Sequence, residues 1–186
     1  MKVLVIDNYD SFIYNVIHIL KELGVETIDI IKNDKIELEQ IDQYDKIILS
    51  PGPGIPSEAG KLMDVIAYAA DHKDILGICL GHQAIGEYYG HQLKRLETPL
   101  HGISSPIQLA APDDIFQSMP DHSPIAHYHS WVIEESNSEL AITAYDEQQN
   151  IMAVKHRTLN VRGVQFHPES ILTTYGKEII KNWIKN

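Results

Sequence analysis

Cysteine is almost missing from the sequence: Cys79 is the only one among 186 residues. A single thiol forms no internal disulfide, so we expect a reducing compartment, the cytoplasm. Long apolar runs are missing too. The run Val3–Ile6 ends at Asp7, too early for a signal-peptide core, and no stretch reaches the ~18 apolar residues of a membrane span. We therefore expect no membrane partner.

Basic residues are scarce. Lys and Arg number 15 against 26 Asp and Glu, giving a net charge of −11. Non-specific nucleic-acid binding needs clustered Lys and Arg on phosphates, so a nucleic-acid partner is excluded. The chain is 44% hydrophobic, which suffices for one compact core at this length, and we expect a single domain over residues 1–186.

In the first half, short apolar segments alternate with helix-like ones. The predicted strands are Lys2–Ile6, Val25–Ile31, Lys46–Leu49 and Ile75–Ile78. The predicted helices are Ser11–Leu23, Glu58–Asp71 with Ser57 as N-cap, and Leu80–Tyr89. This alternation predicts an α/β fold with a mostly parallel sheet and helices on both faces.

The second half is rich in strands and has one clear helix, Tyr175–Ile184. The strand-like segments are Ser105–Leu109, Ala126–His129, Leu140–Tyr145, Ile151–Lys155 and Arg162–Phe166. We interpret them as an antiparallel extension of the same sheet. Ligands of open α/β sheets bind at the carboxyl ends of the strands. The segments Asp7–Ser11, Ser50–Gly54 and Cys79–Gln83 lie at such ends.

Cys79 lies where an apolar strand meets a helix, within Gly77-Ile78-Cys79-Leu80-Gly81. A nucleophile on so tight a turn needs small neighbours two residues away on either side. The helix N-terminus also stabilises a thiolate. A buried structural cysteine is the commoner fate of a free thiol, but the two glycines favour a nucleophile.

His167 and Glu169 are a candidate base and its orienting partner. Pro168 holds His167 extended, and residues two apart in an extended segment point the same way. Glu169 would then hold one imidazole nitrogen and leave the other for the thiol. The alternative is an exposed His and Glu at a strand end. His127 and His129 are also two apart but lack further ligands at metal-binding spacing, so we predict no metal site.

The loop Ser50-Pro51-Gly52-Pro53-Gly54 follows the third predicted strand. Its prolines fix φ and its glycines permit close backbone approach to a ligand. Such a loop can direct N–H groups at an oxyanion, where one donor contributes about 3 kcal/mol. An ordinary connecting loop would have a similar composition.

Together these motifs resemble the class I, or triad, glutamine amidotransferases. Gly77–Gln83 matches the nucleophile motif of that family and Phe166–Ser170 its His-x-Glu motif. Further stretches resemble the small subunit of anthranilate synthase and the glutaminase of aminodeoxychorismate synthase: Asp7–Phe12, Ser50–Gly54, Pro56–Gly60, His101-Gly102, Tyr128–Ser130 and His167–Thr174. The resemblance extends from Asp7 to Gly176, nearly the whole chain.

The resemblance implies a flavodoxin-like three-layer sandwich and a catalytic triad of Cys79, His167 and Glu169. It implies that L-glutamine is held by Gly52, Pro53, Gly54, Gln83, Ser130 and Trp131, with the N–H groups of Leu80 and Gly52 as oxyanion donors. Ammonia would pass to a chorismate-binding large subunit, component I. No cofactor is expected in this chain, and Mg²⁺ is expected on the partner, because this acidic chain lacks the clustered arginines that chorismate would require.

Two positions depart from the family pattern. Ile103 stands where Lys is usual, which would alter a partner-facing or signalling contact. Trp131 stands where an aliphatic residue is common, which is harmless if this position contributes mainly backbone atoms. Tyr9, Asp10 and Ser11 would line the ammonia exit, or Asp10 or Ser11 simply caps the next helix.

Several functions remain open. Pro56–Gly60 and Leu172–Thr174 favour anthranilate and the tryptophan branch over aminodeoxychorismate and the folate branch, although one subunit can serve both. A non-catalytic binding subunit is disfavoured by the intact Cys79, His167 and Glu169. A stand-alone γ-glutamyl hydrolase is disfavoured by the partner-type motifs Asp7–Phe12 and Tyr128–Ser130.

Overall fold

A computed structural model describes all residues, 1–186, and its centre is an eight-stranded sheet in the order β2-β1-β3-β4-β10-β9-β8-β6. The strands of this sheet are β1 (Lys2–Asp7), β2 (Thr27–Lys32), β3 (Lys46–Leu49), β4 (Asp74–Ile78), β6 (Gln108–Leu109), β8 (Leu140–Tyr145), β9 (Ile151–His156) and β10 (Val161–Val164). The helices are α1 (Ile13–Glu22), α2 (Leu62–Ala69), α3 (Leu80–Tyr88) and α4 (Gly176–Lys185).

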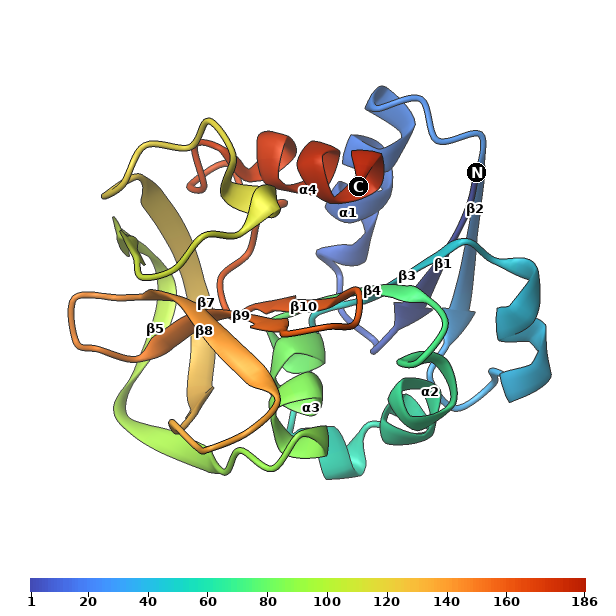
Figure 1. Cartoon of the computed structure of the whole chain (residues 1–186), viewed down its shortest axis with the longest axis horizontal. Coiled ribbons are helices and arrows are strands. Elements are labelled where there is room, and N and C mark those ends of the chain that lie inside the picture. The colour runs from blue at the N-terminus through green and yellow to red at the C-terminus, as the bar shows by residue number, and fades with distance from the viewer.

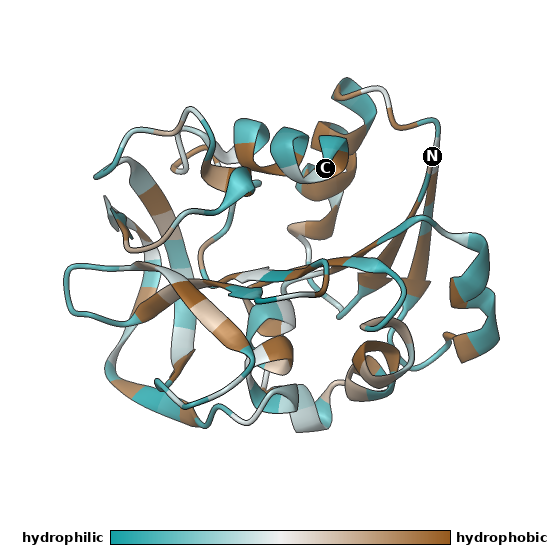
Figure 2. Cartoon of the chain, viewed as in Figure 1, coloured by the Kyte–Doolittle hydropathy of each residue, from teal (hydrophilic) through white to brown (hydrophobic).

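The sheet is the middle of three layers. Helices α1 and α4 cover one face and α2 and α3 cover the other (Figure 1). Strands β1, β3 and β4 are almost entirely apolar, as expected for strands buried on both faces (Figure 2). One core cluster includes Trp183 of α4 and Val16 of α1, and the other includes Leu62 and Ile66 of α2. The predicted α/β three-layer architecture is confirmed.

The parallel part of the sheet brings the functional loops together. Strand β1 pairs in parallel with β2 and β3, and β3 pairs in parallel with β4. The carboxyl ends of β1, β3 and β4 therefore meet at one edge. Strand β10 pairs in parallel with β4 and antiparallel with β9, so the change of direction falls beside the strand that carries the Cys79 turn.

The second half corrects one expectation. Strands β9, β8 and β6 extend the sheet antiparallel as predicted. The segment around Ala126–His129, however, belongs to β7 (Pro124–Ile133), which pairs with β5 (Leu93–Pro106) in a separate two-stranded sheet. Strand β5 was not predicted because its sequence is largely polar and exposed, with register shifts near Leu100 and His101. The predicted strand Ser105–Leu109 is divided between the two sheets.

The predicted helix Glu58–Asp71 is present as the shorter α2, but its predicted start and its N-cap at Ser57 are wrong. Pro56–Glu58 forms a 3₁₀ turn, and α2 begins only at Leu62 after Lys61. Gly60 separates the two with φ of +57°, and a Cβ there would lie 2.7 Å from Asn33 Oδ1. This left-handed residue ends the first turn before a continuous helix can form. None of the helices has both the length and the apolar character needed to cross a membrane.

Candidate active site

A pocket of about 220 Å³ lies at the carboxyl ends of β3 and β4, against β7. Its lining residues are Gly52, Pro53, Gly54, Cys79, Gln83, Tyr128, His129, Ser130 and Trp131. The structure thus brings the predicted nucleophile together with all the predicted glutamine-binding side chains and loop residues except Leu80, which follows Cys79 directly. Loops from the parallel sheet form one wall and β7 of the separate sheet forms the other.

Cys79 has a strained backbone, with φ of 50° and ψ of −100°, at the N-cap of α3. Such a conformation costs about 1–3 kcal/mol in a non-glycine residue and persists only where its surroundings enforce it. Here the Cys79 N–H donates to the carbonyl of Val164 on β10 at 2.9 Å, and its carbonyl accepts from Gln83 N–H at 3.0 Å. Both ends of the turn are held, so the thiol stands at the helix start.

The two flanking glycines are required by close packing. A Cβ on Gly77 would lie 2.5 Å from the carbonyl carbon and oxygen of Gly81. A Cβ on Gly81 would lie 2.4 Å from the carbonyl oxygen of Leu49 on β3. In both cases the obstacle is backbone, which has little freedom to move. The small residues on either side of Cys79 therefore let α3 start close against the sheet.

His167 and Glu169 form a buried hydrogen-bonded pair. Nδ1 of His167 lies 2.6 Å from Oε1 of Glu169, and the two side chains are 2% and 0% exposed. The backbone is fixed as well, because His167 N–H donates to the carbonyl of Ala126 at 3.1 Å and the Thr173 hydroxyl donates to the carbonyl of His167 at 2.6 Å. The alternative of an exposed His and Glu is thereby excluded.

The electrostatics of His167 favour its charged form. Burial alone lowers the pKa of the imidazole, but the nearby Cys79 sulfur and the Glu169 carboxylate outweigh burial and raise that pKa to about 10. Apart from the neighbouring Cys79 sulfur, Nε2 has no hydrogen-bond partner within the chain. With Nδ1 held by Glu169, Nε2 is the nitrogen available to exchange a proton with Cys79.

Two aromatic rings hold the imidazole from the side. The ring of Tyr128 meets that of His167 edge-on, with centroids 5.0 Å apart, and the Phe12 ring lies 5.3 Å from it. Phe12 and Tyr128 are themselves 4.9 Å apart. Phe12 and Tyr128 belong to the family motifs named above, but their contact with His167 was not predicted. Asp10 accepts the Phe12 N–H at 2.6 Å in the turn before α1, but neither Asp10 nor Ser11 is the N-cap, which is Phe12.

The loop after β3 is braced by Asn8. The Asn8 N–H donates to Ser50 Oγ at 2.9 Å, and its side-chain amide donates to the Ser50 carbonyl at 2.7 Å. A Cβ on Gly52 would lie 2.5 Å from Asn8 Cβ and 2.7 Å from Leu80 Cδ2. Gly52 and Leu80, the two predicted oxyanion donors, are therefore direct neighbours beside Cys79.

Trp131 presents its backbone to the site. Its carbonyl accepts a hydrogen bond of 2.9 Å from Nε2 of Gln83. The indole ring lies 6.0 Å from the guanidinium of Arg95 on β5. The contact with Gln83 does not depend on the side chain at position 131, as expected for this departure from the family pattern. Ile103, the other departure, is 46% exposed on β5.

Three further imidazoles near the site are buried, those of His82, His127 and His129, and no role for them at the triad was predicted. Burial lowers the pKa of His82 and of His129 to about 3, so both are neutral at pH 7. The rings of His127 and His129 are 5.3 Å apart, and Nε2 of His127 lies 2.7 Å from Ser105 Oγ. No group of three or more His, Cys, Asp or Glu side chains is arranged to hold a metal ion.

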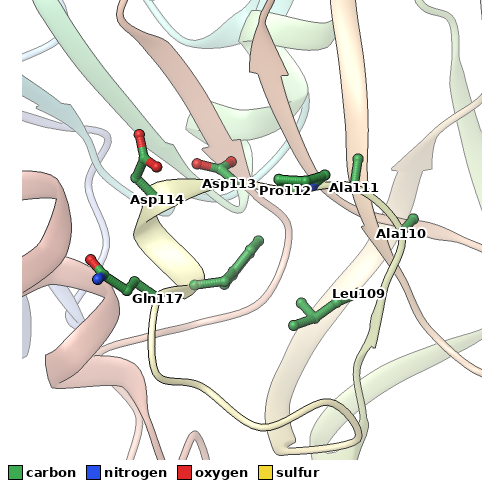
Figure 3. Close-up of a pocket in the computed structure, with 8 residues that line it drawn as sticks. Leu109, Ala110, Ala111, Pro112, Asp113, Asp114 and Gln117 are labelled. Atoms are coloured by element: carbon green, nitrogen blue, oxygen red, sulfur yellow. The ribbon is translucent and has the colours of Figure 1, made fainter.

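A wider hollow of about 590 Å³ lies elsewhere, between Leu109 and Gln117 (Figure 3). Asp113 and Asp114 stand at one end of it and Leu109 and Ala110 at the other. Asp113 is already paired, accepting from Nε of Arg162 at 2.9 Å. This hollow has no cysteine, serine or histidine among its lining residues, so the chemistry belongs to the smaller pocket at Cys79.

Comparison with known proteins agrees with this geometry. The family model described as glutamine amidotransferase class-I matches residues 4–186. Anthranilate synthase component 2 of Pyropia yezoensis is 42% identical over 98% of both chains, and that of Pseudomonas putida is 40% identical over 100% of this chain and 97% of its own. The Bacillus subtilis protein named aminodeoxychorismate/anthranilate synthase component 2 is 39% identical over 98% of this chain and 95% of its own.

Solved structures show the same fold. A Thermoplasma acidophilum protein described as a putative GMP synthase subunit superposes with a TM-score of 0.90 at 27% identity, covering 100% of this chain and 92% of that one. A Thermotoga maritima glutamine amidotransferase superposes with a TM-score of 0.79 at 15% identity, covering 100% and 96%. The chain therefore belongs to the class-I glutamine amidotransferase family. Within it, the chain is a glutamine amidotransferase subunit of the anthranilate synthase and aminodeoxychorismate synthase group.

Proposed function

We propose that the chain hydrolyses L-glutamine at Cys79 and delivers the ammonia to a chorismate-using synthase subunit that makes anthranilate. The observation that carries this proposal is the position of Cys79. Its thiol occupies a strained turn at a helix N-terminus, in the pocket of 220 Å³, and contributes to the raised pKa of His167.

The chemistry follows from the positions of these groups. Nε2 of His167 takes the Cys79 proton, and the thiolate attacks the side-chain amide carbon of glutamine. The N–H groups of Leu80 and Gly52 receive the oxyanion. His167 then returns the proton to the departing nitrogen, which leaves as ammonia. The γ-glutamyl group remains bonded to the Cys79 sulfur as a thioester. Water, activated by the same imidazole, cleaves the thioester, releases glutamate and restores the thiol.

The partner is proposed from the relatives. The name anthranilate synthase component 2, carried by relatives 40–42% identical, supports a partner component I. We propose that this partner binds chorismate and Mg²⁺. No cofactor is assigned to this chain itself. We propose the tryptophan branch, supported by Pro56–Gly60 and Leu172–Thr174. The second candidate is the folate branch or a dual role, which is favoured by the Bacillus subtilis relative whose name combines both activities. The cytoplasm is the proposed location.

Reconstitution tests the proposal. The chain would be co-purified with each candidate large subunit, and chorismate and glutamine would be supplied. We expect glutamine-dependent anthranilate from one complex, and weak glutaminase activity from the isolated chain that rises on adding the partner. Cys79→Ala should abolish the use of glutamine and leave ammonia-dependent synthesis intact. Glutamine-dependent turnover by Cys79→Ala would show that another residue is the nucleophile.

A further inference from the structure

Gln165 is a buried polar residue that the reaction scheme leaves unused. It follows the last residue of β10, Val164, and is 0% exposed. Its backbone N–H donates to the carbonyl of Met152 on β9 at 2.8 Å, so its position is set by the sheet. A fully buried amide requires hydrogen-bond partners, and the identity of those partners is informative.

The side chain of Gln165 joins two parts of the site. Its Nε2 donates to Sγ of Cys79 at 3.6 Å, and its Oε1 accepts from Nε2 of Gln83 at 3.1 Å. One amide thus contacts both the nucleophile and a lining residue of the pocket. An N–H directed at the sulfur stabilises the thiolate more than the neutral thiol, because hydrogen bonds to charged groups are the stronger ones.

The second contact fixes the orientation of Gln83. Nε2 of Gln83 donates to Gln165 Oε1 and also to the carbonyl of Trp131 at 2.9 Å, so both of its hydrogens are used. Rotating the amide by half a turn would place Oε1 of Gln83 against two acceptor oxygens. Oε1 takes part in none of the chain's hydrogen bonds, and Gln83 lines the pocket. An acceptor is therefore held ready for a ligand N–H.

We infer that Gln165 is a positioning residue that serves nucleophile and substrate together: its amide nitrogen supports the Cys79 thiolate, and its amide oxygen fixes Gln83 so that Oε1 accepts an N–H of the bound substrate. The substrate half of this inference rests on the proposed glutaminase activity. The sulfur half does not, because it concerns the free chain.

Gln165→Met tests both halves, since Met has a similar volume and neither donor nor acceptor of comparable strength. On the isolated chain, the pH dependence of Cys79 alkylation by iodoacetamide would be measured. In the complex with the synthase subunit, kcat and KM for glutamine would be measured. We expect the alkylation midpoint to rise by about one pH unit, equivalent to a tenfold loss of thiolate, and KM to rise severalfold.

Two further variants separate the roles. Gln83→Met should raise KM but move the alkylation midpoint less than Gln165→Met does, because the amide that donates to Cys79 is retained even though its Oε1 loses a partner. Thr143→Val removes a different fully buried polar group, on β8, and should move neither. Should Gln165→Met fail to fold, Gln165→Glu preserves shape and the oxygen facing Gln83. Its added negative charge should raise the alkylation midpoint while KM stays near that of the native protein.

An unchanged alkylation profile in a folded Gln165→Met or Gln165→Glu variant would overturn the sulfur half of the inference. An unchanged KM in Gln165→Met would overturn the substrate half. If the native complex fails to use glutamine, it is the proposed function that fails, and the alkylation profile still decides whether Gln165 supports the sulfur.

Discussion

Oε1 of Glu169 lies 2.6 Å from Nδ1 of His167, and neither group has appreciable access to water. The carboxylate therefore fixes which imidazole nitrogen faces Cys79, and it contributes to the raised pKa of His167. His167 and Glu169, two residues apart in the sequence, thus act as a single buried pair. Geometry and charge in this pair can be separated by substitution.

Glu169→Gln keeps an oxygen near Nδ1 but removes the charge. We expect the pKa of His167 to fall and kcat/KM for glutamine to drop about 10- to 100-fold, because a hydrogen bond to a charged group contributes about 1.5–3 kcal/mol. The measurement is glutamine-dependent kinetics of the complex. Ammonia-dependent synthesis serves as the control and should be unchanged. A Glu169→Gln enzyme of native efficiency would remove the carboxylate from the mechanism.

The glycine at position 81 gives a steric prediction. In Gly81→Ala the new Cβ would meet the Leu49 backbone at 2.4 Å, so α3 must shift from β3. We expect a loss of about 1–3 kcal/mol in the free energy of unfolding and a steep fall in Cys79 alkylation rate. Denaturant titration and alkylation kinetics measure the two effects.

Gly86→Ala is the matched control on the same helix. Its Cβ would meet side-chain atoms of Ile133, the nearest at 2.7 Å, and not backbone. Stability should fall, but alkylation of the folded protein should keep its native rate. Equal alkylation losses in both variants would mean that the turn at Cys79 does not need its small neighbour.

The sequence predicted those parts of the site that local rules determine. The turn at Cys79 follows from Gly77 and Gly81. The pair at positions 167 and 169 is predicted correctly but for the wrong reason: β10 ends at Val164, and residues 167–170 form a turn closed by a 3.2 Å hydrogen bond from Ser170 N–H to the His167 carbonyl. The role of Gln165, which lies between β10 and this turn, is not predicted from the sequence. A polar residue between the apolar Val164 and Phe166 was the visible indication.

The missed features depend on contacts distant in sequence. Strand β5 carries little apolar pattern, and its partner β7 looked like one more strand of the main sheet. The placement of Tyr128 against His167 follows from that separate sheet, so no local rule could give it. The break at Gly60 likewise depends on Asn33, which lies 27 residues earlier in the chain.

Trp131→Leu tests whether position 131 acts through its backbone. The Trp131 carbonyl accepts from Gln83, and a leucine would present the same carbonyl. We expect kcat/KM for glutamine to stay within about threefold, with a stability loss of about 0.5–1 kcal/mol from the Arg95 contact. A loss beyond tenfold in steady-state kinetics would show that the indole itself contacts the substrate.

Buried neutral histidines predict a loss of stability in acid. The pKa of His82 is lowered by burial to about 3 in the folded chain, below the usual value of 6.5. Between those two pH values the unfolded chain binds a proton that the folded chain excludes, so stability present above pH 6.5 is lost as the pH falls toward 3. Each such histidine contributes up to about 1.4 kcal/mol per pH unit in this window.

His82→Leu removes one of these titratable groups and fills its buried position with an apolar side chain. The free energy of unfolding of this variant should therefore fall less steeply than that of the native chain as the pH is lowered. Urea titrations at pH 6.5, 5.5 and 4.5 would compare the slopes; the expected difference from the native chain is about 1.4 kcal/mol per pH unit. Ile85→Val, one turn along α3, controls for lost packing and should lower the whole curve by about 0.5–1.5 kcal/mol without changing its slope. Parallel native and His82→Leu curves would mean that the imidazole gains a proton inside the fold, against the burial that lowers its pKa.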